Sequence, residues 1–267
     1  MSQLQFILSF CFGSVIGSFL NVVILRLPAG QKITGRSHCQ SCLKQLSGPD
    51  LVPVLSFVWL RGRCRYCRAK ISWRYFIIEI ICGLLFAVSW QYLKPVNPFG
   101  LLLLAKYWLS VAALIVVFAI DLEHYLILDE VLIWSSAGVL ILNLMLDAAA
   151  HFNLLNIHGS FLSGLLGALV FFSFFFLIWL ASSGKWLGFG DVKLAVLLGL
   201  VLGWPLVSVG LMLAVILGGL FSSILLIFTD KTLKSQIPFG TFLSLATVLT
   251  LFLGPILLSW YLSILGF

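Results

Sequence analysis

Two groups of residues in this sequence are of types that do chemistry, and the first is a set of four cysteines. They form two Cys-x-x-Cys motifs, Cys39 with Cys42 and Cys64 with Cys67, separated by residues 43–63. Two such motifs can arrange four thiolates tetrahedrally around zinc, which would fold a loop that has little core of its own. Two disulfides or four free thiols are the alternatives, and a reducing cytoplasm disfavours the disulfides. Four thiolates leave no open coordination position, so we expect a structural zinc site.

The second group is a pair of aspartates. Asp121 directly follows the apolar run 99–120, and Asp191 lies in the segment Gly-Phe-Gly-Asp before another apolar run. Taken singly, Asp191 could cap a helix and Asp121 could be a solvated acid at a membrane surface. Taken together, with Gly188 and Gly190 allowing close backbone approach, they predict the catalytic pair of an aspartyl protease. One carboxyl would stay protonated and polarise a peptide carbonyl while the other takes a proton from water.

Motifs of other hydrolases are missing from the sequence. It contains no His-Glu-x-x-His of zinc proteases, no Asp-Thr-Gly of soluble aspartic proteases and no Gly-x-Ser-Gly of rhomboid type. Near the aspartates, we expect Asp129 to cap the helix that follows it. Lys193 either favours the ionised form of Asp191 or marks the cytoplasmic side of the membrane.

The elements that must position these residues are membrane helices. The chain has 267 residues, of which 61% are hydrophobic and 9% charged, and its mean hydropathy is +1.15, which excludes an ordinary soluble domain. We expect an all-α polytopic membrane protein with about eight transmembrane helices and a small zinc-binding loop between the first two. The apolar runs are 4–27, 75–93, 99–120, 131–150, 161–181, 192–204, 206–228 and 239–265. The sixth run is the short one, so it either leaves Asp191 inside the membrane or forms a re-entrant helix.

The distribution of charge predicts the orientation. The net charge is +7, and nine basic residues but one acid lie between Lys32 and Arg74. This excess belongs to one loop, so we expect no nucleic acid partner, only membrane lipid around the helices. Simple alternation places every Lys and Arg except Lys94 and Lys106 on the side of that loop, which should be cytoplasmic. The N-terminus is then extracytoplasmic, and both aspartates face the cytoplasm. The predicted division is a first transmembrane helix (1–27), a cysteine loop (28–74) and a protease domain (75–267).

The combined motifs resemble those of type IV prepilin peptidases over essentially the whole chain. The matching segments are GSFLNVVILRLP at 17–28, the cysteine pairs, PVLS at 53–56, LRGRCRYC at 60–67, ISWRY at 71–75 with Glu79, and GFGDVKL at 188–194. The chain departs from the usual pattern at Leu128, where proline is common, and at Leu51, where asparagine often follows the aspartate. The Leu51 departure leaves methylation less secure than cleavage.

The resemblance implies a bifunctional enzyme of a type IV pilus or type II secretion system in the bacterial inner membrane. Such an enzyme cleaves the short basic leader of prepilins or pseudopilins on the cytoplasmic side, with Asp121 and Asp191 as the catalytic pair. It then methylates the new N-terminal residue, using S-adenosylmethionine as methyl donor. Because the family associates methylation with the first helix and the cysteine loop, Gly17, Asn21 and Glu79 are candidates for the donor site. Their alternative roles are helix packing, an interhelical hydrogen bond and an interfacial acid.

Two other functions remain possible from the sequence. A presenilin-like intramembrane aspartyl protease without methyl transfer shares the Gly-x-Gly-Asp segment, but this function does not explain the four cysteines. A proton-coupled transporter using Asp121 and Asp191 fits less well, because the sequence shows no convincing internal repeat and no acid at mid-span.

Overall fold

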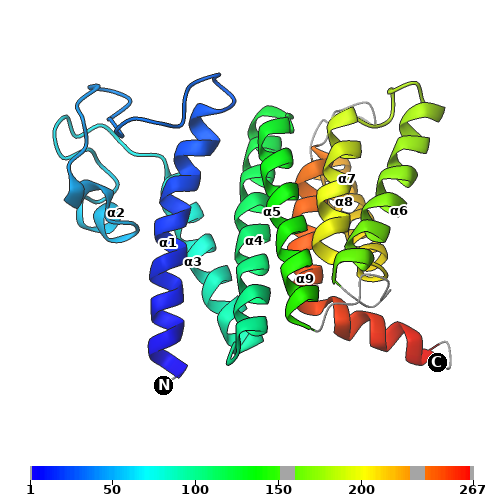
Figure 1. Cartoon of the computed structure of the whole chain (residues 1–267). Coiled ribbons are helices and arrows are strands. Elements are labelled where there is room, and N and C mark those ends of the chain that lie inside the picture. Colours follow the sequence, from blue (N-terminus) through cyan, green and yellow to red (C-terminus); the bar gives the residue numbers. More distant parts are fainter. Residues whose placement is uncertain (1, 151–159, 229–237, 265–267) are drawn as a thin grey trace. The chain divides into compact units, whose positions relative to one another are not determined.

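The computed structural model describes residues 2–150, 160–228 and 238–264, and these are nearly all helical (Figure 1). The chain divides into two compact units, residues 1–94 and 95–267. The first contains α1 (Ser2–Arg26), the 3-10 turn η1 (Gly48–Leu51), α2 (Leu55–Trp59) and α3 (Trp73–Leu93). The second contains α4 (Pro98–His124), α5 (Asp129–Ala149), α6 (Ser160–Ala181), α7 (Phe189–Leu202), α8 (Leu206–Phe228) and α9 (Phe239–Ile264).

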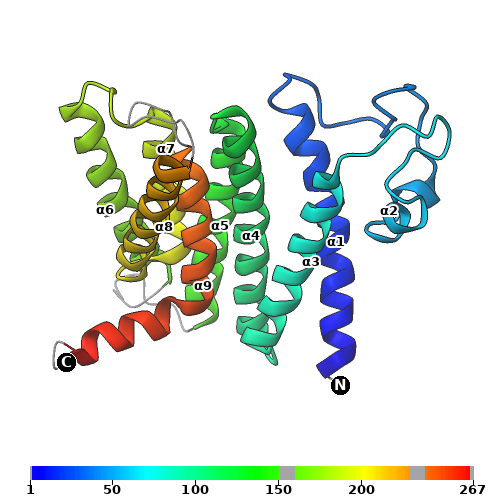
Figure 2. The same ribbon diagram turned by 180° about the vertical axis from the view of Figure 1, so that it is seen from behind.

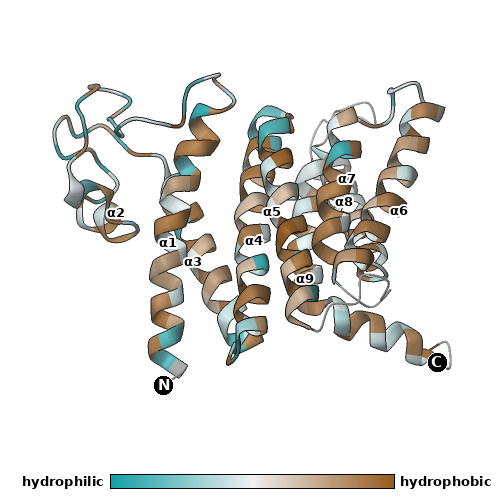
Figure 3. Cartoon of the chain, in the orientation of Figure 1, coloured by the Kyte–Doolittle hydropathy of each residue, from teal (hydrophilic) through white to brown (hydrophobic). Residues whose placement is uncertain are grey.

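The expected membrane architecture is confirmed. In the described part of the chain, seven helices are long and apolar enough to cross a membrane, namely α1, α3, α4, α5, α6, α8 and α9. Polar residues gather mainly in the connections and at helix ends, most visibly in the loop of the first unit (Figure 3). The eighth expected crossing corresponds to α7, whose 14 residues give about 21 Å of helix against a hydrocarbon core of about 30 Å. The short sixth apolar run therefore does form a short helix.

In the first unit, α1 and α3 pack tightly along their lengths. A Cβ atom at Gly17 would lie 2.9 Å from the Cα of Glu79, so only glycine permits this approach. Nearer the Arg26 end of α1, the side-chain amide of Asn21 donates to the carbonyl of Tyr75 at 3.1 Å. Arg26 itself is buried and donates to backbone carbonyls of the following turn, Thr34 at 3.0 Å among them. These contacts fix where the loop leaves α1 and where it re-enters α3.

In the second unit, successive helices from α4 to α9 alternate in direction (Figures 1 and 2). The first residues of α7 and of α9 therefore lie at the same end of this unit as the last residues of α4. Protein surrounds the short helix α7, whose Val192, Leu194, Leu197 and Leu198 are fully buried. A helix that is apolar all round and buried in a bundle need not match the bilayer thickness.

The opposite end of the second unit has its own polar contacts. Asp147 near the end of α5 accepts backbone N–H groups of Ser160 at 2.7 Å and Phe161 at 2.9 Å, which caps α6. Pro255 lies inside α9, and the last part of that helix turns aside (Figure 1), because proline cannot donate a helical hydrogen bond. Neither feature is near the aspartates described next.

Candidate active site and metal centre

Asp121 lies in the last turn of α4 and is 5% exposed. The helix ends soon afterwards at Tyr125, a left-handed residue (φ 54°) whose N–H donates to the Asp121 carbonyl at 2.9 Å. Left-handed backbone ends a helix by satisfying a free terminal carbonyl. The carboxyl of Asp121 is thus presented at a helix end while remaining shielded from solvent.

The carboxyl of Asp121 is held by the first turn of α9. Both the backbone N–H of Thr241 and its hydroxyl donate to Oδ2 of Asp121, at 2.6 Å and 3.0 Å. The preceding residue allows this, because a Cβ at Gly240 would lie 3.0 Å from that same oxygen and 2.9 Å from Cδ1 of Ile127. These two bonds orient the carboxylate, and the first satisfies an N–H group that a helix start leaves free.

Asp191 occupies the first turn of α7 and is 9% exposed. Its Oδ1 is buried and has no hydrogen-bond partner. Ile127 lies against Gly190, the residue before Asp191, and against Gly240, which also approaches Oδ2 of Asp121. The expected meeting of the two aspartates at one end of the bundle therefore agrees with this geometry, and Asp191 keeps one oxygen available.

The glycine directly before Asp191 allows close approach, as expected, whereas Gly188 has only an ordinary contact. A Cβ at Gly190 would lie 3.1 Å from Cβ of Ile127, and the same isoleucine contacts the Gly240 position. Ile127 thus fills the space between the beginnings of α7 and α9, and both glycines leave room for it. At Gly188 a Cβ would meet only Oδ2 of Asp191, at 3.6 Å.

Lys193 forms an ion pair with Asp129. Its Nζ is 2.7 Å from each carboxylate oxygen of Asp129, so of the two expectations for Lys193, direct pairing with Asp191 is not seen. The expectation that Asp129 caps the following helix was wrong. Leu128 is the N-cap of α5 and makes no side-chain capping bond, and Asp129 in the first helical turn links α5 to α7 instead.

The four loop cysteines form a compact cluster. Their sulfur atoms all lie within 4.8 Å of one another, and the sulfurs of Cys39 and Cys67 are 3.8 Å apart. Zinc–sulfur bonds of about 2.3 Å place tetrahedral ligands about 3.8 Å apart, so the donor set fits a zinc ion. All four are free thiols. Backbone N–H groups of Cys42 and Ser41 lower the pKa of Cys39 to about 6. Despite the backbone N–H of Ala69, desolvation and the neighbouring sulfurs raise the pKa of Cys67 to about 11, so the four thiols do not ionise equally.

The two cysteine motifs have the same local backbone structure. In each, the N–H of the residue four positions after the first cysteine donates back to that cysteine's carbonyl, from Leu43 to Cys39 and from Arg68 to Cys64. Both donors are left-handed, with φ of 56° and 60°. One isolated antiparallel bridge closes each motif. The chain therefore presents two equivalent turns, each offering two sulfurs.

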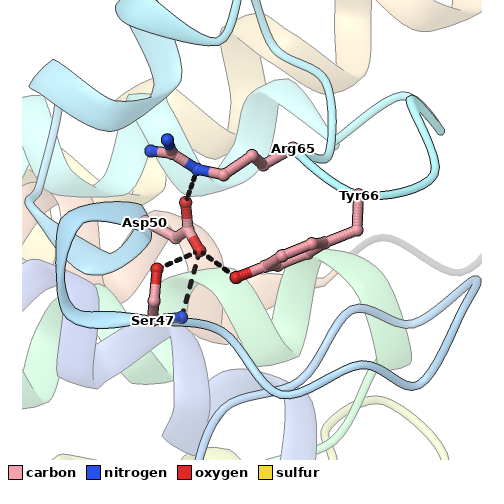
Figure 4. Close-up of polar contacts among 4 residues, drawn as sticks. All are labelled: Ser47, Asp50, Arg65 and Tyr66. Carbon is pink, nitrogen blue, oxygen red and sulfur yellow. Dashed lines mark hydrogen bonds and ion pairs between the residues drawn. The ribbon is translucent and has the colours of Figure 1, made fainter.

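Asp50 ties the turn η1 to the second cysteine motif (Figure 4). Its Oδ2 accepts from the backbone and hydroxyl of Ser47 at 3.0 Å and 2.7 Å, and from the hydroxyl of Tyr66 at 3.3 Å. Its Oδ1 accepts from Nε of Arg65 at 2.5 Å. Burial alone would raise the pKa of Asp50, but the bonds from Ser47 and Arg65 outweigh it and lower the pKa to about 2. Leu51, the departure from the family pattern, is 41% exposed and outside this network.

Gly17, Asn21 and Glu79 lie together in the first unit, but they pack α1, α3 and the loop. Gly17 contacts Glu79 directly, and Oε2 of Glu79 accepts the backbone N–H of Val54 at 2.7 Å. Among the side-chain atoms of these three residues, Oδ1 of Asn21 is the one that is buried without a hydrogen-bond partner. A Cβ at Gly17 would also lie 3.0 Å from Cβ of Cys82. These three residues therefore take part in packing, and their role in binding a methyl donor stays a prediction.

Thr241 is the residue that sequence reasoning missed. It lies 120 positions from the aspartate it contacts, and a threonine that begins a long apolar helix carries no recognisable signal. A Phe-Gly-Thr sequence directly after a proline, at 238–241, is the one local hint, because glycine at a helix start permits close approach of another chain segment.

Comparison with known proteins finds a family match in each of the two units. Residues 11–93 match the Bacterial Peptidase A24 N-terminal domain, and residues 108–223 match the Type IV leader peptidase family. Proteins named prepilin leader peptidase/N-methyltransferase are similar over nearly the full length. That of Aeromonas salmonicida (strain A449) is 31% identical, covering 97% of this chain and 94% of the relative.

Two further relatives carry the same name. The Burkholderia pseudomallei (strain 1026b) protein is 31% identical, over 94% of this chain and 86% of its own. The Bacillus subtilis (strain 168) protein is 28% identical, over 95% and 96%. No solved structure matches the chain. With two buried aspartates at one end of a helical bundle and a four-cysteine loop before it, the chain belongs to the type IV leader peptidase family.

Proposed function

We propose that this protein cleaves prepilins or pseudopilins with Asp121 and Asp191 as the catalytic pair. The observation that carries the proposal is the unequal environment of the two carboxyls. Oδ2 of Asp121 accepts two hydrogen bonds from Thr241, whereas Oδ1 of Asp191 is buried without a partner. Close carboxyl groups in different surroundings divide the roles of acid and base between them.

The hydrogen bonds at Asp121 favour one division of the roles. Two donors on Oδ2 of Asp121 stabilise its ionised form relative to Asp191, whose Oδ1 has no donor, so Asp121 is suited to act as the base. Protonated Asp191 would donate to the carbonyl oxygen of the scissile peptide. Asp121 takes a proton from water as the water oxygen adds to the carbonyl carbon. The resulting diol then collapses, the C–N bond breaks and a proton passes to the leaving amine.

The names of the relatives support prepilins as the substrate, and the distribution of charge supports the side of cleavage. Relatives are named prepilin leader peptidases, and a prepilin would present its leader at the membrane face where α4 ends and α7 begins. We propose that this face is cytoplasmic and the N-terminus extracytoplasmic, because the basic loop should lie inside. A multi-pass protein of the bacterial inner membrane is consistent with the helices and relatives alike.

We propose that Cys39, Cys42, Cys64 and Cys67 bind one structural zinc ion. When bound, the ion would hold the two equivalent turns together and supply no reactive position. Methylation of the new N-terminal residue, with S-adenosylmethionine as donor, is proposed because the relatives are also named N-methyltransferases. Gly17, Asn21 and Glu79 remain the candidates for donor binding, beside their part in packing.

The test uses the full-length protein in detergent or nanodiscs with a full-length prepilin and S-adenosylmethionine. The product's intact mass is recorded for wild type, Asp121→Asn and Asp191→Asn. Wild type should remove the leader and add one methyl group, and neither variant should cleave. Cleavage at a wild-type rate by either variant would overturn the catalytic assignment.

The same measurement separates the alternatives. Cleavage without added methyl mass would leave a peptidase of presenilin-like type. An absence of any cleavage by folded, zinc-loaded protein would overturn the peptidase function. Each variant also receives precleaved pilin, so that methylation is scored independently of proteolysis.

A further inference from the structure

The short helix α2 has two apolar faces, and the first packs inside the loop. Phe57 is buried, with its ring stacked on that of Phe76 (centroids 5.0 Å apart) and tilted against that of Trp73 (5.1 Å). Phe76 and Trp73 belong to the first turn of α3. This aromatic cluster attaches α2 directly to the beginning of a membrane span.

The second face of α2 is exposed. Leu55, Val58 and Trp59 have exposed fractions of 67%, 59% and 85%. Their spacing of three and four residues places them on one side of the helix. Three large apolar side chains side by side in water are unfavourable, so this face needs an occupant.

The depth of α2 along α3 identifies the environment of this face. The N-cap of α2, Val54, donates its backbone N–H to Oε2 of Glu79 at 2.7 Å. Glu79 lies six residues after Trp73, the first residue of α3, so it is about 9 Å along the helix axis. Figures 1 and 2 show α2 alongside α1 rather than beyond its Arg26 end. The exposed face is therefore level with the first turns of a membrane helix.

The charge next to α2 matches the surface of an anionic bilayer. Arg61 and Arg63 follow the helix within four residues of Trp59, and both are exposed. Trp beside Arg is the composition of segments that rest at the boundary between head groups and acyl chains. Glu79 does not oppose this attraction, because it is buried and accepts a bond from Val54.

We propose that α2 is an interfacial helix, with Leu55, Val58 and Trp59 inserted into the bilayer leaflet next to the cysteine loop. The occupant of its exposed face is lipid, and Arg61 and Arg63 contact the head groups. The cysteine cluster is then held against the membrane surface instead of moving freely in the cytoplasm.

The test uses full-length protein labelled with 5-fluorotryptophan, in nanodiscs of phosphatidylethanolamine and phosphatidylglycerol. The ¹⁹F resonance that disappears in Trp59→Phe is Trp59. Its broadening is measured with lipid carrying a nitroxide near the head group, and separately with a water-soluble gadolinium chelate. Trp134, 78% exposed on the membrane helix α5, is the lipid control. A Lys32→Trp variant, at an exposed site in the turn after α1, is the water control.

The expected result is broadening of Trp59 by the lipid nitroxide to the degree seen for Trp134, with several-fold less broadening by gadolinium than for Lys32→Trp. Strong broadening by gadolinium alone would place the face in water and overturn the proposal. Protection from both agents would mean that protein covers the face, which overturns it equally. Either result is independent of whether the enzyme cleaves prepilins.

Discussion

Thr241 holds Asp121 through two hydrogen bonds to a single carboxylate oxygen, one from its backbone and one from its hydroxyl. The two residues come from the beginning of α9 and the end of α4. Asp191 lacks such donors on Oδ1. The arrangement makes two chemically identical side chains unequal, which is what an acid and a base in one reaction require.

Thr241→Val should lower kcat/KM for prepilin cleavage about tenfold, because one hydrogen bond to a charged group contributes about 1.5 kcal/mol. The backbone donor remains, and Thr241→Ser should keep nearly wild-type activity. The acidic limb of the pH–rate profile should move to higher pH in Thr241→Val, since the ionised base loses a hydrogen-bond donor. Thr247→Val is the control, because that buried hydroxyl of α9 bonds only the Leu243 carbonyl in the contacts observed. A wild-type pH profile in Thr241→Val would contradict the positioning role.

Gly240→Ala should reduce cleavage more than Thr241→Val does. The added methyl group would lie 3.0 Å from Oδ2 of Asp121 and 2.9 Å from Cδ1 of Ile127, and both contacts are too close. Adding Ile127→Val removes one of these contacts and should restore part of the activity, measured as the initial cleavage rate. Gly219→Ala is the matched control, because a Cβ there meets nothing within 4 Å. Equal rates for the Gly240 and Gly219 variants would refute the predicted crowding.

Cys39→Ser combined with Cys64→Ser should remove the zinc, because each motif loses one of its two ligands. Metal content by mass spectrometry should fall from one zinc per chain to none. Cys11→Ser should keep its zinc, since Cys11 is an exposed thiol of α1 outside the cluster. Methylation should suffer at least as much as proteolysis in the double variant. Unchanged zinc content in the double variant would exclude this site.

Asp50→Asn should loosen the loop at neutral pH, seen as faster hydrogen exchange in residues 47–66. The pKa of Asp50 falls from 3.8 to about 2 on folding. The carboxylate therefore stabilises the fold fully above about pH 4, and this contribution disappears as the pH drops through 2. The difference between variant and wild type should be constant from pH 5 to 8. Arg68→Gln, at an exposed site of the same motif, should change exchange less; an equal effect would argue against a specific role for Asp50.

Exchanging the charges of Asp129 and Lys193 tests what the lysine does. Lys193→Glu alone should destabilise the protein modestly, since exposed ion pairs contribute about 0.2–1 kcal/mol. The side chain of Lys193 is 39% exposed and that of Asp129 is 55% exposed. Adding Asp129→Arg should recover thermal stability and cleavage if the pair only joins α5 to α7. Recovery of stability with a pH–rate profile still shifted would mean that Lys193 acts on Asp191 directly.

Much of the site was predictable because its signals are local. Long apolar runs specify membrane helices, and alternation then places Asp121 and Asp191 at one end whatever the details of packing. Cysteine spacing likewise predicts a cluster, because two residues between ligands suit one turn. None of these inferences needs knowledge of which helices are neighbours.

The rest depends on contacts between distant segments. Thr241 reaches Asp121 because α9 packs on α4, and helix order in the sequence does not specify that pairing. Ile127 packs against Gly190 and Gly240, which explains why both positions are glycine. In the sequence, an isoleucine between two helices gives no indication of this packing. The contacts of Asp50 carry no local signal either, because its partner Arg65 belongs to a motif 15 residues away.

The position of Thr241 in the last helix also bears on when the proposed catalytic pair is fully assembled. Membrane helices enter the bilayer in sequence order during synthesis, so Asp121 is in place well before α9 arrives. Until then its carboxyl lacks both donors, and the base of the proposed pair is unsupported. On the proposed assignment, proteolysis therefore requires the complete bundle and not only the two helices that carry the aspartates.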